Sequence, residues 1–460
     1  MTRLRAFELP TELLCITFGF CVPHPIILPP APFNTALAIA HTCRLWRYTL
    51  LRIPNLWNNI LLDFTNCSKP LRLLAYAKTW LSQSDTLITL RNSTSRWGER
   101  LLLKHEIDIV RELVAPFSSR FREIDLRFAE ASIDEFFCFP QNSITNLEVL
   151  YLETLGFTVP ISSLDVFRSA PRLRRVLLST DMCSIDPAAL CLPWGQLTAL
   201  HFIATYIPSL SIHEIFRAAP NLEECSCSIV QIDDEVISQL DQLPACTLPR
   251  LRVLLVEFAV GTGNGAFPFL RPLILPALAD LELRPLESAF LPATPFPCAA
   301  YLALLARSKF IMKRLAILHY TIPPDDLLLI VRGMPSLQSF QLYFWETAEW
   351  DPEVLSGLRD GSLLPRLESL TFSIYPLDSV LDALEGRAKL PTSGSDRDAK
   401  VAPLKELNME VTWRPDVSQQ AMDRFMRIAE LGGGGLKCRA FTHTRAYAHD
   451  RTTQTFATST

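Results

Sequence analysis

The chain has 460 residues, of which 49% are apolar and 20% are charged, so it can bury a large core and is not expected to be disordered as a whole. Its 44 basic and 48 acidic residues leave a net charge of −4, which argues against nucleic acid as a main partner. Only 16 residues are glycine, which weighs against folds built around glycine-rich phosphate loops.

The first 65 residues predict a short helical module. A helix opens at Pro10 and carries apolar residues as far as Phe18. Five prolines between positions 23 and 32 predict a loop that cannot be helical. Asn34 can cap a second helix that contains Trp46, and a last short element follows Pro54.

Three motifs of this module stand in a fixed order: Leu9-Pro10-x-Glu12-Leu13-Leu14, Cys43-Arg44-x-Trp46-Arg47 and Pro54-x-x-Trp57. Together they resemble the F-box of SCF-type ubiquitin ligase receptors. The resemblance implies that the module binds a Skp-type adaptor, and through it a cullin, while the rest of the chain captures a target protein. The adaptor-facing residues that it implies are Leu9, Pro10, Glu12, Leu13, Leu14, Ile16, Leu45, Trp46 and Trp57. The alternative is that these residues only pack the N-terminal cap of the domain that follows.

From residue 66 to residue 414 one pattern recurs, a turn followed by L-x-x-L-x-L with apolar substitutions. Weaker copies start at Thr86 and Arg120, and neighbouring strong copies lie 22 to 37 residues apart. The first apolar residues of the ten strong copies are Leu147, Leu173, Leu197, Leu222, Leu251, Leu278, Leu315, Leu337, Leu367 and Leu404. The pattern resembles leucine-rich repeats, although the Asn or Cys expected three residues after the last leucine is missing. We therefore expect irregular repeats with uneven curvature.

The alternating L-x-L end of each copy suits a short strand with one buried face. Segments between copies show helical spacing and end near a proline, as in residues 161–171, 211–220, 233–244 and 324–335. The predicted fold class is α/β: a short N-terminal helical F-box, followed by an irregular leucine-rich-repeat solenoid with parallel strands on its concave face and helices on its convex face.

The concave sheet of a solenoid is its usual binding surface, so outward-facing strand residues are candidates for contact with a target. They combine aromatic with charged side chains, which favours a protein partner: Tyr151, Glu153, His201, Glu257, Glu282, Arg284, His319, Tyr343 and Trp345. The densest aromatic group, Tyr343, Phe344, Trp345 and Trp350, is either a binding hot spot or part of the core.

Beyond the repeats, residues 415–432 predict a C-terminal capping helix with Val417, Met422, Phe425 and Ala429 facing inward. Residues 433–460 predict a flexible tail, and residues 391–400 a polar insertion.

No sequence feature predicts a catalytic, metal-binding or phosphate-binding site in this chain. The eight histidines and twelve cysteines show no metal-ligand spacing, and the segment from Gly261 to Gly265 lacks the rest of a phosphate-binding motif. Cys225 and Cys227 fall on core positions of their repeat. We expect no cofactor, no metal and no catalysis.

The chain has no uninterrupted apolar run of membrane-spanning length, and its N-terminus lacks the pattern of a signal peptide. We therefore expect a cytoplasmic or nuclear protein with reduced cysteines and without membrane partners. The predicted function is the substrate-recognition subunit of an SCF-type ubiquitin ligase. The alternative is a repeat scaffold outside any ligase.

Overall fold

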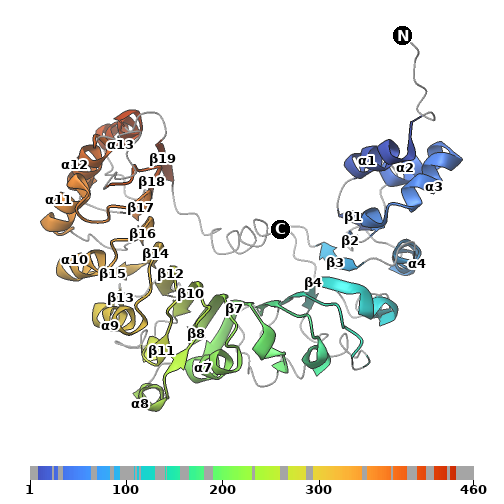
Figure 1. Ribbon diagram of the computed structural model, residues 1–460, viewed down its shortest axis with the longest axis horizontal. Coiled ribbons are helices and arrows are strands. Elements are labelled where there is room, and N and C mark those ends of the chain that lie inside the picture. The colour runs from blue at the N-terminus through green and yellow to red at the C-terminus, as the bar shows by residue number, and fades with distance from the viewer. Residues whose placement is uncertain are drawn as a thin grey trace, which may run out of the picture. The chain divides into compact units, whose positions relative to one another are not determined.

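The computed structural model of the chain forms two compact units, Met1–Leu222 with Ser226–Ser228, and Glu223–Cys225 with Ile229–Thr460 (Figure 1). The residues that the structure describes are 9–22, 25–28, 35–57, 59–63, 70–82, 87–93, 108, 111–112, 115–129, 140, 142–155, 165–180, 190–230, 234–258, 268–285, 294–343, 350–373, 377–390, 401–410, 419–431 and 436–441.

In the first unit the strands of the main sheet lie in chain order and all pair in parallel. They are β1 (Ile26–Leu28), β2 (Asn59–Asp63), β3 (Ile88–Ser93), β4 (Phe121–Ala129), β5 (Val149–Leu155), β6 (Arg175–Ser179) and β7 (Ala199–Pro208). The α-helices whose bounds the structure describes are α1 (Thr11–Cys21), α2 (Thr35–Thr42), α3 (Arg44–Leu51), α4 (Pro70–Leu81) and α7 (Ser209–Ala218). Among the described residues, short 3-10 helices form further outer turns: η1 (Pro54–Trp57), η2 (Ala115–Arg120), η3 (Asp165–Ser169) and η5 (Trp194–Gln196).

Strand β8 (Glu224–Val230) contains the boundary between the units. The parallel main sheet of the second unit continues with β10 (Val253–Phe258), β12 (Asp280–Pro285), β14 (Arg314–Leu318), β16 (Ser339–Tyr343), β17 (Ser369–Ser373), β18 (Glu406–Glu410) and β19 (Lys437–Phe441). Two strand pairs stand apart from it, β9 (Cys246–Thr247) with β11 (Leu273–Ile274), and β13 (Thr294–Pro295) with β15 (Tyr320–Thr321).

The helical segments of the second unit are α8 (Asp234–Gln242), η6 (Pro268–Leu270), α9 (Cys298–Ser308), α10 (Pro324–Arg332), α11 (Pro352–Asp360), α12 (Leu377–Ala388) and α13 (Gln419–Leu431). In Figure 1 helices α9 to α13 lie on one side of this unit's sheet, and none of the described helices lies on its other side. We call that second side the open face. In the first unit the same name is used for the side of the sheet that carries Tyr151 and Glu153, which alternate along β5 with the buried Leu150 and Leu152.

The apolar positions of the repeat form continuous buried rows. The second apolar residues of successive repeats are paired in register in the first unit, through Ile60, Leu90, Ile124, Leu150, Val176 and Leu200. In the second unit the same row runs through Leu254, Leu281, Leu315, Phe340, Leu370 and Leu407. All are buried, and each such side chain stabilises the fold by about 1.5–3 kcal/mol. This register confirms the predicted α/β solenoid of leucine-rich-repeat type, including the two weaker copies that become β3 and β4.

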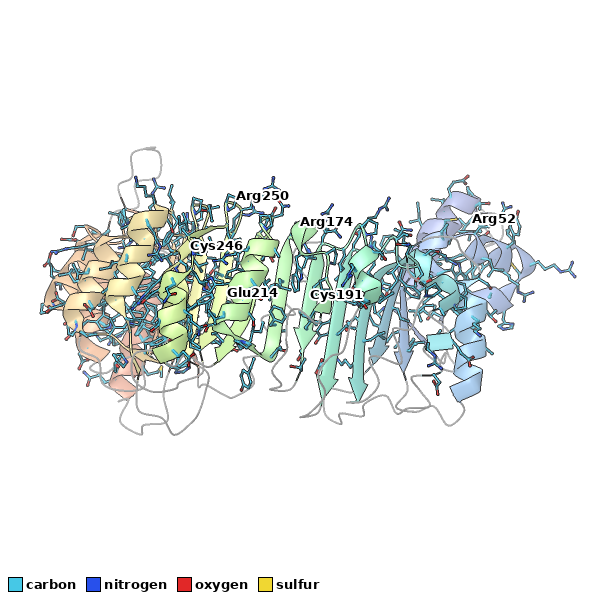
Figure 2. All side chains as sticks on the ribbon, turned by 90° about the horizontal axis from the view of Figure 1, so that it is seen from below. Arg52, Arg174, Cys191, Glu214, Cys246 and Arg250 are labelled. Carbon is cyan, nitrogen blue, oxygen red and sulfur yellow. The ribbon has the colours of Figure 1, made fainter. Side chains whose placement is uncertain are left out.

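In several repeats a proline fixes the turn that precedes the strand. In six repeats the motif x-Pro-x-Leu closes a four-residue turn, in which the leucine N–H donates to the carbonyl of the first residue over 3.0–3.4 Å. Proline suits the second position of such a turn because its φ angle is already set. The six leucines are Leu173, Leu222, Leu251, Leu278, Leu337 and Leu367. Figure 2 labels Arg174 and Arg250, which lie close to two of these turns, at the edge where the strands of each sheet begin.

A polar side chain before the first leucine links neighbouring repeats. Asn146 Nδ2 donates to Ser119 O, and Asn221 Nδ2 donates to Gly195 O, both at 2.7 Å. Gln196 occupies the same repeat position, and its Nε2 donates to Ala170 O at 2.6 Å. These bonds satisfy carbonyls at the end where the strands begin, opposite to the end at which the missing Asn or Cys would act.

The N-terminal module is joined to the first sheet. Strand β1 lies inside the proline-rich segment that the sequence predicts as a loop, and it pairs with β2, which pairs with β3. Trp57 Nε1 donates to Leu50 O at 3.3 Å, and its ring packs edge-on against Trp80 of α4, with centroids 4.7 Å apart. The predicted boundary at residue 65 is therefore crossed by both strand pairing and aromatic packing. The proposed cap at Asn34 lies outside the described residues.

One repeat is displaced by three residues from its predicted register. Leu315 pairs with Leu281 and Phe340, so it is the second apolar residue of its copy, and Met312 is the first. Both Met312-x-x-Leu315 and Leu315-x-x-Leu318 fit the apolar pattern, and only the strand pairing distinguishes them. The steps from Leu278 to Met312 and on to Leu337 become 34 and 25 residues, in place of 37 and 22.

Two further elements, one outer helix and one strand, also differ from the prediction. Helix formation at 161–171 is limited, among described residues, to the 3-10 helix η3, because Pro171 follows directly after so short a segment. Residues 437–441, predicted as tail, form β19, since Cys438 and Ala440 continue the alternation opposite Leu407 and Met409.

Helix α13 therefore lies between two strands instead of ending the solenoid. Its buried residues are Ala421, Phe425 and Ile428, whereas Met422 and Ala429 are half-buried. Val417, the insertion at 391–400 and the tail beyond 441 lie outside the described residues.

Candidate functional site

The outer surface of the N-terminal helices is unusually apolar. Among the described residues eleven large hydrophobic side chains are exposed, and seven of these lie between positions 13 and 51. They are Leu13, Ile16 and Phe20 of α1, Ile27 of β1, and Leu45, Tyr48 and Leu51 of α3. The inner sides of α1 and α3 pack on each other, and the centroids of the Phe18 and Trp46 rings are 5.2 Å apart. An apolar surface of this density is typical of a docking site for another protein.

The structure divides the nine predicted adaptor-facing residues into three groups. Pro10, Glu12, Leu13, Ile16 and Leu45 are exposed. Leu9 and Trp46 are half-buried.

Leu14 and Trp57 are core residues with 1% and 4% of their surface exposed, which corrects their predicted place. Leu14 lies one helical turn before Phe18 on the inner side of α1, and Trp57 fills the space between α3 and α4. Phe20, Tyr48 and Leu51 are exposed instead. Their helical spacing was the sequence signal for them, because Phe20 lies four residues after Ile16, Tyr48 three after Leu45, and Leu51 three after Tyr48.

On the open face of the first unit, Tyr151 and Glu153 belong to a mixed-charge cluster. Tyr151 Oη donates to Glu153 Oε2 at 2.8 Å, and Arg127 Nε lies 2.9 Å from the same oxygen. Burial, followed by the charge of Glu153, raises the pKa of Tyr151 well above its usual value. The tyrosine therefore stays a neutral hydrogen-bond donor.

Three further members of this cluster, Arg91, Glu123 and Asp125, were missed by sequence reasoning. Arg91 forms an ion pair with Glu123, and its Nε lies 3.6 Å from Asp125 Oδ2. Burial raises the pKa of Asp125 to about 7, although Arg91 and Arg127 act against that shift. The alternation of polar and apolar residues from Arg122 to Arg127 was the available signal, in a copy treated only as a weak repeat.

His201 lies in the same row of the open face as Tyr151, but it is covered, with 8% of its surface exposed. Burial, with the nearby charge of Arg175, lowers its pKa to about 4. A neutral, covered imidazole is a poor direct contact for a target.

The second unit carries a similar cluster on its open face. Arg284 forms an ion pair with Glu257 and approaches Glu282 at 3.9 Å. Arg314 bridges Asp280 at 2.6 Å and Glu282 at 2.7 Å, and it also donates to Gln341 Oε1 at 3.3 Å. The predicted residues Glu257, Glu282 and Arg284 are thus brought together. Arg314 was not predicted, because it pairs with Asp280 directly before the second apolar residue of its repeat, a position at which no candidate was named.

Of the remaining candidates, His319 and Tyr343 contact each other. His319 follows β14 with a positive φ of 61°, its N–H donates to Tyr343 O at 2.6 Å, and its ring stacks on Tyr343 with centroids 6.3 Å apart. Trp350 is buried, which assigns this part of the predicted aromatic group to the core. Phe344 and Trp345 lie outside the described residues.

No protein-family model and no curated protein matches the sequence. Among solved structures, the chain is similar to a crystal structure of a TLR13–ssRNA13 complex, with 15% identity and a TM-score of 0.44. The match covers 83% of this chain and 49% of that chain, so this chain spans about half of its length.

No helix among the described residues combines the length and apolar character needed to span a membrane.

Proposed function

We propose that the chain is the substrate-recognition subunit of an SCF-type ubiquitin ligase. In this proposal the outer face of α1 and α3 binds a Skp-type adaptor, through which a cullin is reached, and the open face of the repeat sheet holds a target protein. The chain contributes binding and geometry, while its partners carry the chemistry.

The observation that carries the proposal is the concentration of exposed apolar side chains on α1 and α3, in the segment whose motifs resemble an F-box. Leu13 and Leu45 keep 49% and 39% of their surface exposed although the module has a packed interior. Covering such side chains with a helical partner removes apolar surface from water at about 25 cal/mol per Å².

The pairing of β1 with β2 and of β2 with β3 favours a second role, in which the module caps the repeat sheet. The two roles use different surfaces. Inner residues such as Leu14 and Trp57 serve the cap, and outer residues such as Leu13 and Leu45 remain for a partner. A scaffold outside any ligase would use only the cap.

Co-purification with a Skp-type adaptor separates these functions. We expect the wild-type chain to form a stable 1:1 complex, and Leu13→Glu combined with Leu45→Glu to lose it, because two charges would be buried without partners. Both side chains are exposed in the free chain, so the melting temperature should change little.

The matched control is Leu329→Glu on α10, where the leucine is 47% exposed in the other unit. It should bind the adaptor like wild type. A well-folded wild-type chain that captures no adaptor would leave the cap as the role of the module and rule out the ligase function.

A further inference from the structure

The N-terminal module has a charge opposite to that of the whole chain. Between Glu12 and Asp63 the sequence contains no acidic residue, but it contains Arg44, Arg47 and Arg52. These fifty residues therefore carry a charge of +3 in a chain whose net charge is −4. All three arginines lie on α3 or immediately after it.

The arginines share the outer face of α3 with its exposed apolar residues. At 100° per residue, the half-buried Trp46 and the buried Thr49 and Leu50 occupy one side of the helix. The exposed positions alternate around the other side, in the angular order Arg47, Leu51, Arg44, Tyr48, Arg52 and Leu45. We call this side the basic–apolar face.

Two of the arginines are held in place within the module. The Arg52 guanidinium carbon lies 4.1 Å above the centre of the Tyr48 ring, and Arg47 Nε donates to Ala40 O at 2.8 Å. Within the described part of the chain none of the three arginines forms an ion pair with a carboxylate. Figure 2 shows Arg52 on the N-terminal helices. Held guanidinium groups lose less conformational freedom when a partner's carboxylates bind them.

We propose that the basic–apolar face docks a protein surface in which carboxylates border an apolar groove. The inference rests on the proposed function, because the adaptor is the protein that this face would meet. Leu45, Tyr48 and Leu51 fill the groove, and the arginines pair with carboxylates at its rim. Complementary charge of this kind raises the rate of association more than it slows dissociation.

The arrangement fits a protein better than other polyanions. Helices that bind membrane surfaces separate an apolar face from a basic one, whereas here both kinds of side chain share one face and the other face is packed. Single-stranded nucleic acid stacks its bases on exposed aromatic rings, and one face of the Tyr48 ring is covered by Arg52.

The test measures the kinetics of adaptor binding to the full chain. Arg44→Gln combined with Arg52→Gln should lower the association rate constant about tenfold at about 50 mM salt, while the dissociation rate changes less than about twofold. The wild-type rate should fall steeply toward about 500 mM salt, and the rate of the variant should not. The matched control is Arg250→Gln combined with Arg366→Gln, which removes two exposed arginines elsewhere and should behave like wild type.

Equal association rates and equal salt dependence for wild type and the Arg44, Arg52 variant would overturn this inference and leave the proposed function intact. Loss of phosphatidylserine vesicle binding in that variant, with adaptor kinetics unchanged, would assign the face to membranes and also overturn it. A wild-type chain that binds no adaptor would overturn both the function and the inference.

Discussion

At the scale of single residues, burial shifts the pKa values of two groups on the open face of the first unit in opposite directions. His201 has a pKa lowered to about 4 by burial, and Asp125 has a pKa raised to about 7 by burial. The contribution of neutral His201 to the stability of the fold is fully present above pH 6.5, the pKa of histidine in the unfolded chain. It is lost as the pH falls toward 4, the pKa of His201 in the fold. Asp125 acts the other way, because its protonated form is favoured in the fold below pH 7.

We therefore expect His201→Gln to lose less stability than wild type between pH 6.5 and pH 4.5, by up to about 3 kcal/mol. Asp125→Asn should lose more stability than wild type over the same interval. Urea unfolding at the two pH values measures both effects. Identical pH dependence in all three proteins would show that neither group is perturbed by its surroundings.

Arg387 of α12 is the most deeply buried cation among the described residues, and it donates hydrogen bonds to the turn from Leu364 to Leu367. Its guanidinium donates to the carbonyls of Leu364 at 2.9 Å and Leu367 at 3.3 Å, and more weakly to Leu358, Leu363 and Ala402. Burial lowers its pKa to about 10, so it remains charged at neutral pH. The arginine compensates for carbonyls that would otherwise be buried without donors.

We expect Arg387→Met to lower the free energy of unfolding by about 2–4 kcal/mol, because it leaves several buried carbonyls without a donor. Arg387→Lys should recover only part of this, since one ammonium cannot reach all five acceptors. The midpoint of urea unfolding reports the effect, with the exposed Arg427→Met as control. A Met variant as stable as wild type would mean that water can replace the guanidinium.

At the scale of elements, strands and turns follow from local pattern, while their links do not. Apart from the repeat at Leu315, the L-x-L strands and the turns before them occur where the sequence predicts them, because each depends on residues within one repeat. The bonds from Asn146, Gln196 and Asn221 join residues about 26 positions apart. No pattern within a single repeat shows which carbonyl these side chains will meet.

The end of α11 gives a prediction at this scale. Gly361 has a φ of 76°, and a Cβ added there would lie 2.6 Å from the Val401 side chain. We expect Gly361→Ala to destabilise the second unit by about 1–3 kcal/mol, from backbone strain and from displacement of Val401. Differential scanning calorimetry measures the change.

The control is Gly195→Ala, whose new methyl group would meet only Ala218 O at 3.8 Å. It should alter stability by less than about 1 kcal/mol. Equal effects at the two glycines would contradict the role of the left-handed conformation at the end of α11.

At the scale of the whole molecule, the N-terminal module and the repeats are connected within the first unit through Trp57. This ring lies between α3 and α4 and contacts Trp80, so module and solenoid share one hydrophobic core. An apolar outer face on a module anchored in this way is held at a fixed place relative to the strands of its own unit.

We expect Trp57→Ala to cost about 3–5 kcal/mol and to weaken near-ultraviolet circular dichroism from the tryptophan pair. Trp57→Phe should retain most of the stability. If Trp57→Ala abolished adaptor binding without lowering the unfolding midpoint, Trp57 would contact the partner directly, as the motif resemblance implies, instead of packing the core.

The sequence by itself determined the repeat, its strands, most of its outer helices and the apolar nature of the N-terminal helices. These depend on periodicity and turn chemistry within about 30 residues. Only the tertiary structure decided the register at Met312, the pairing of β1 and β2 with the repeats, and the burial of Leu14 and Trp57. It also decided that Arg91, Glu123 and Asp125 meet on one face. Each of these depends on contacts between repeats, where several registers satisfy the same apolar pattern and only packing of the whole sheet selects one.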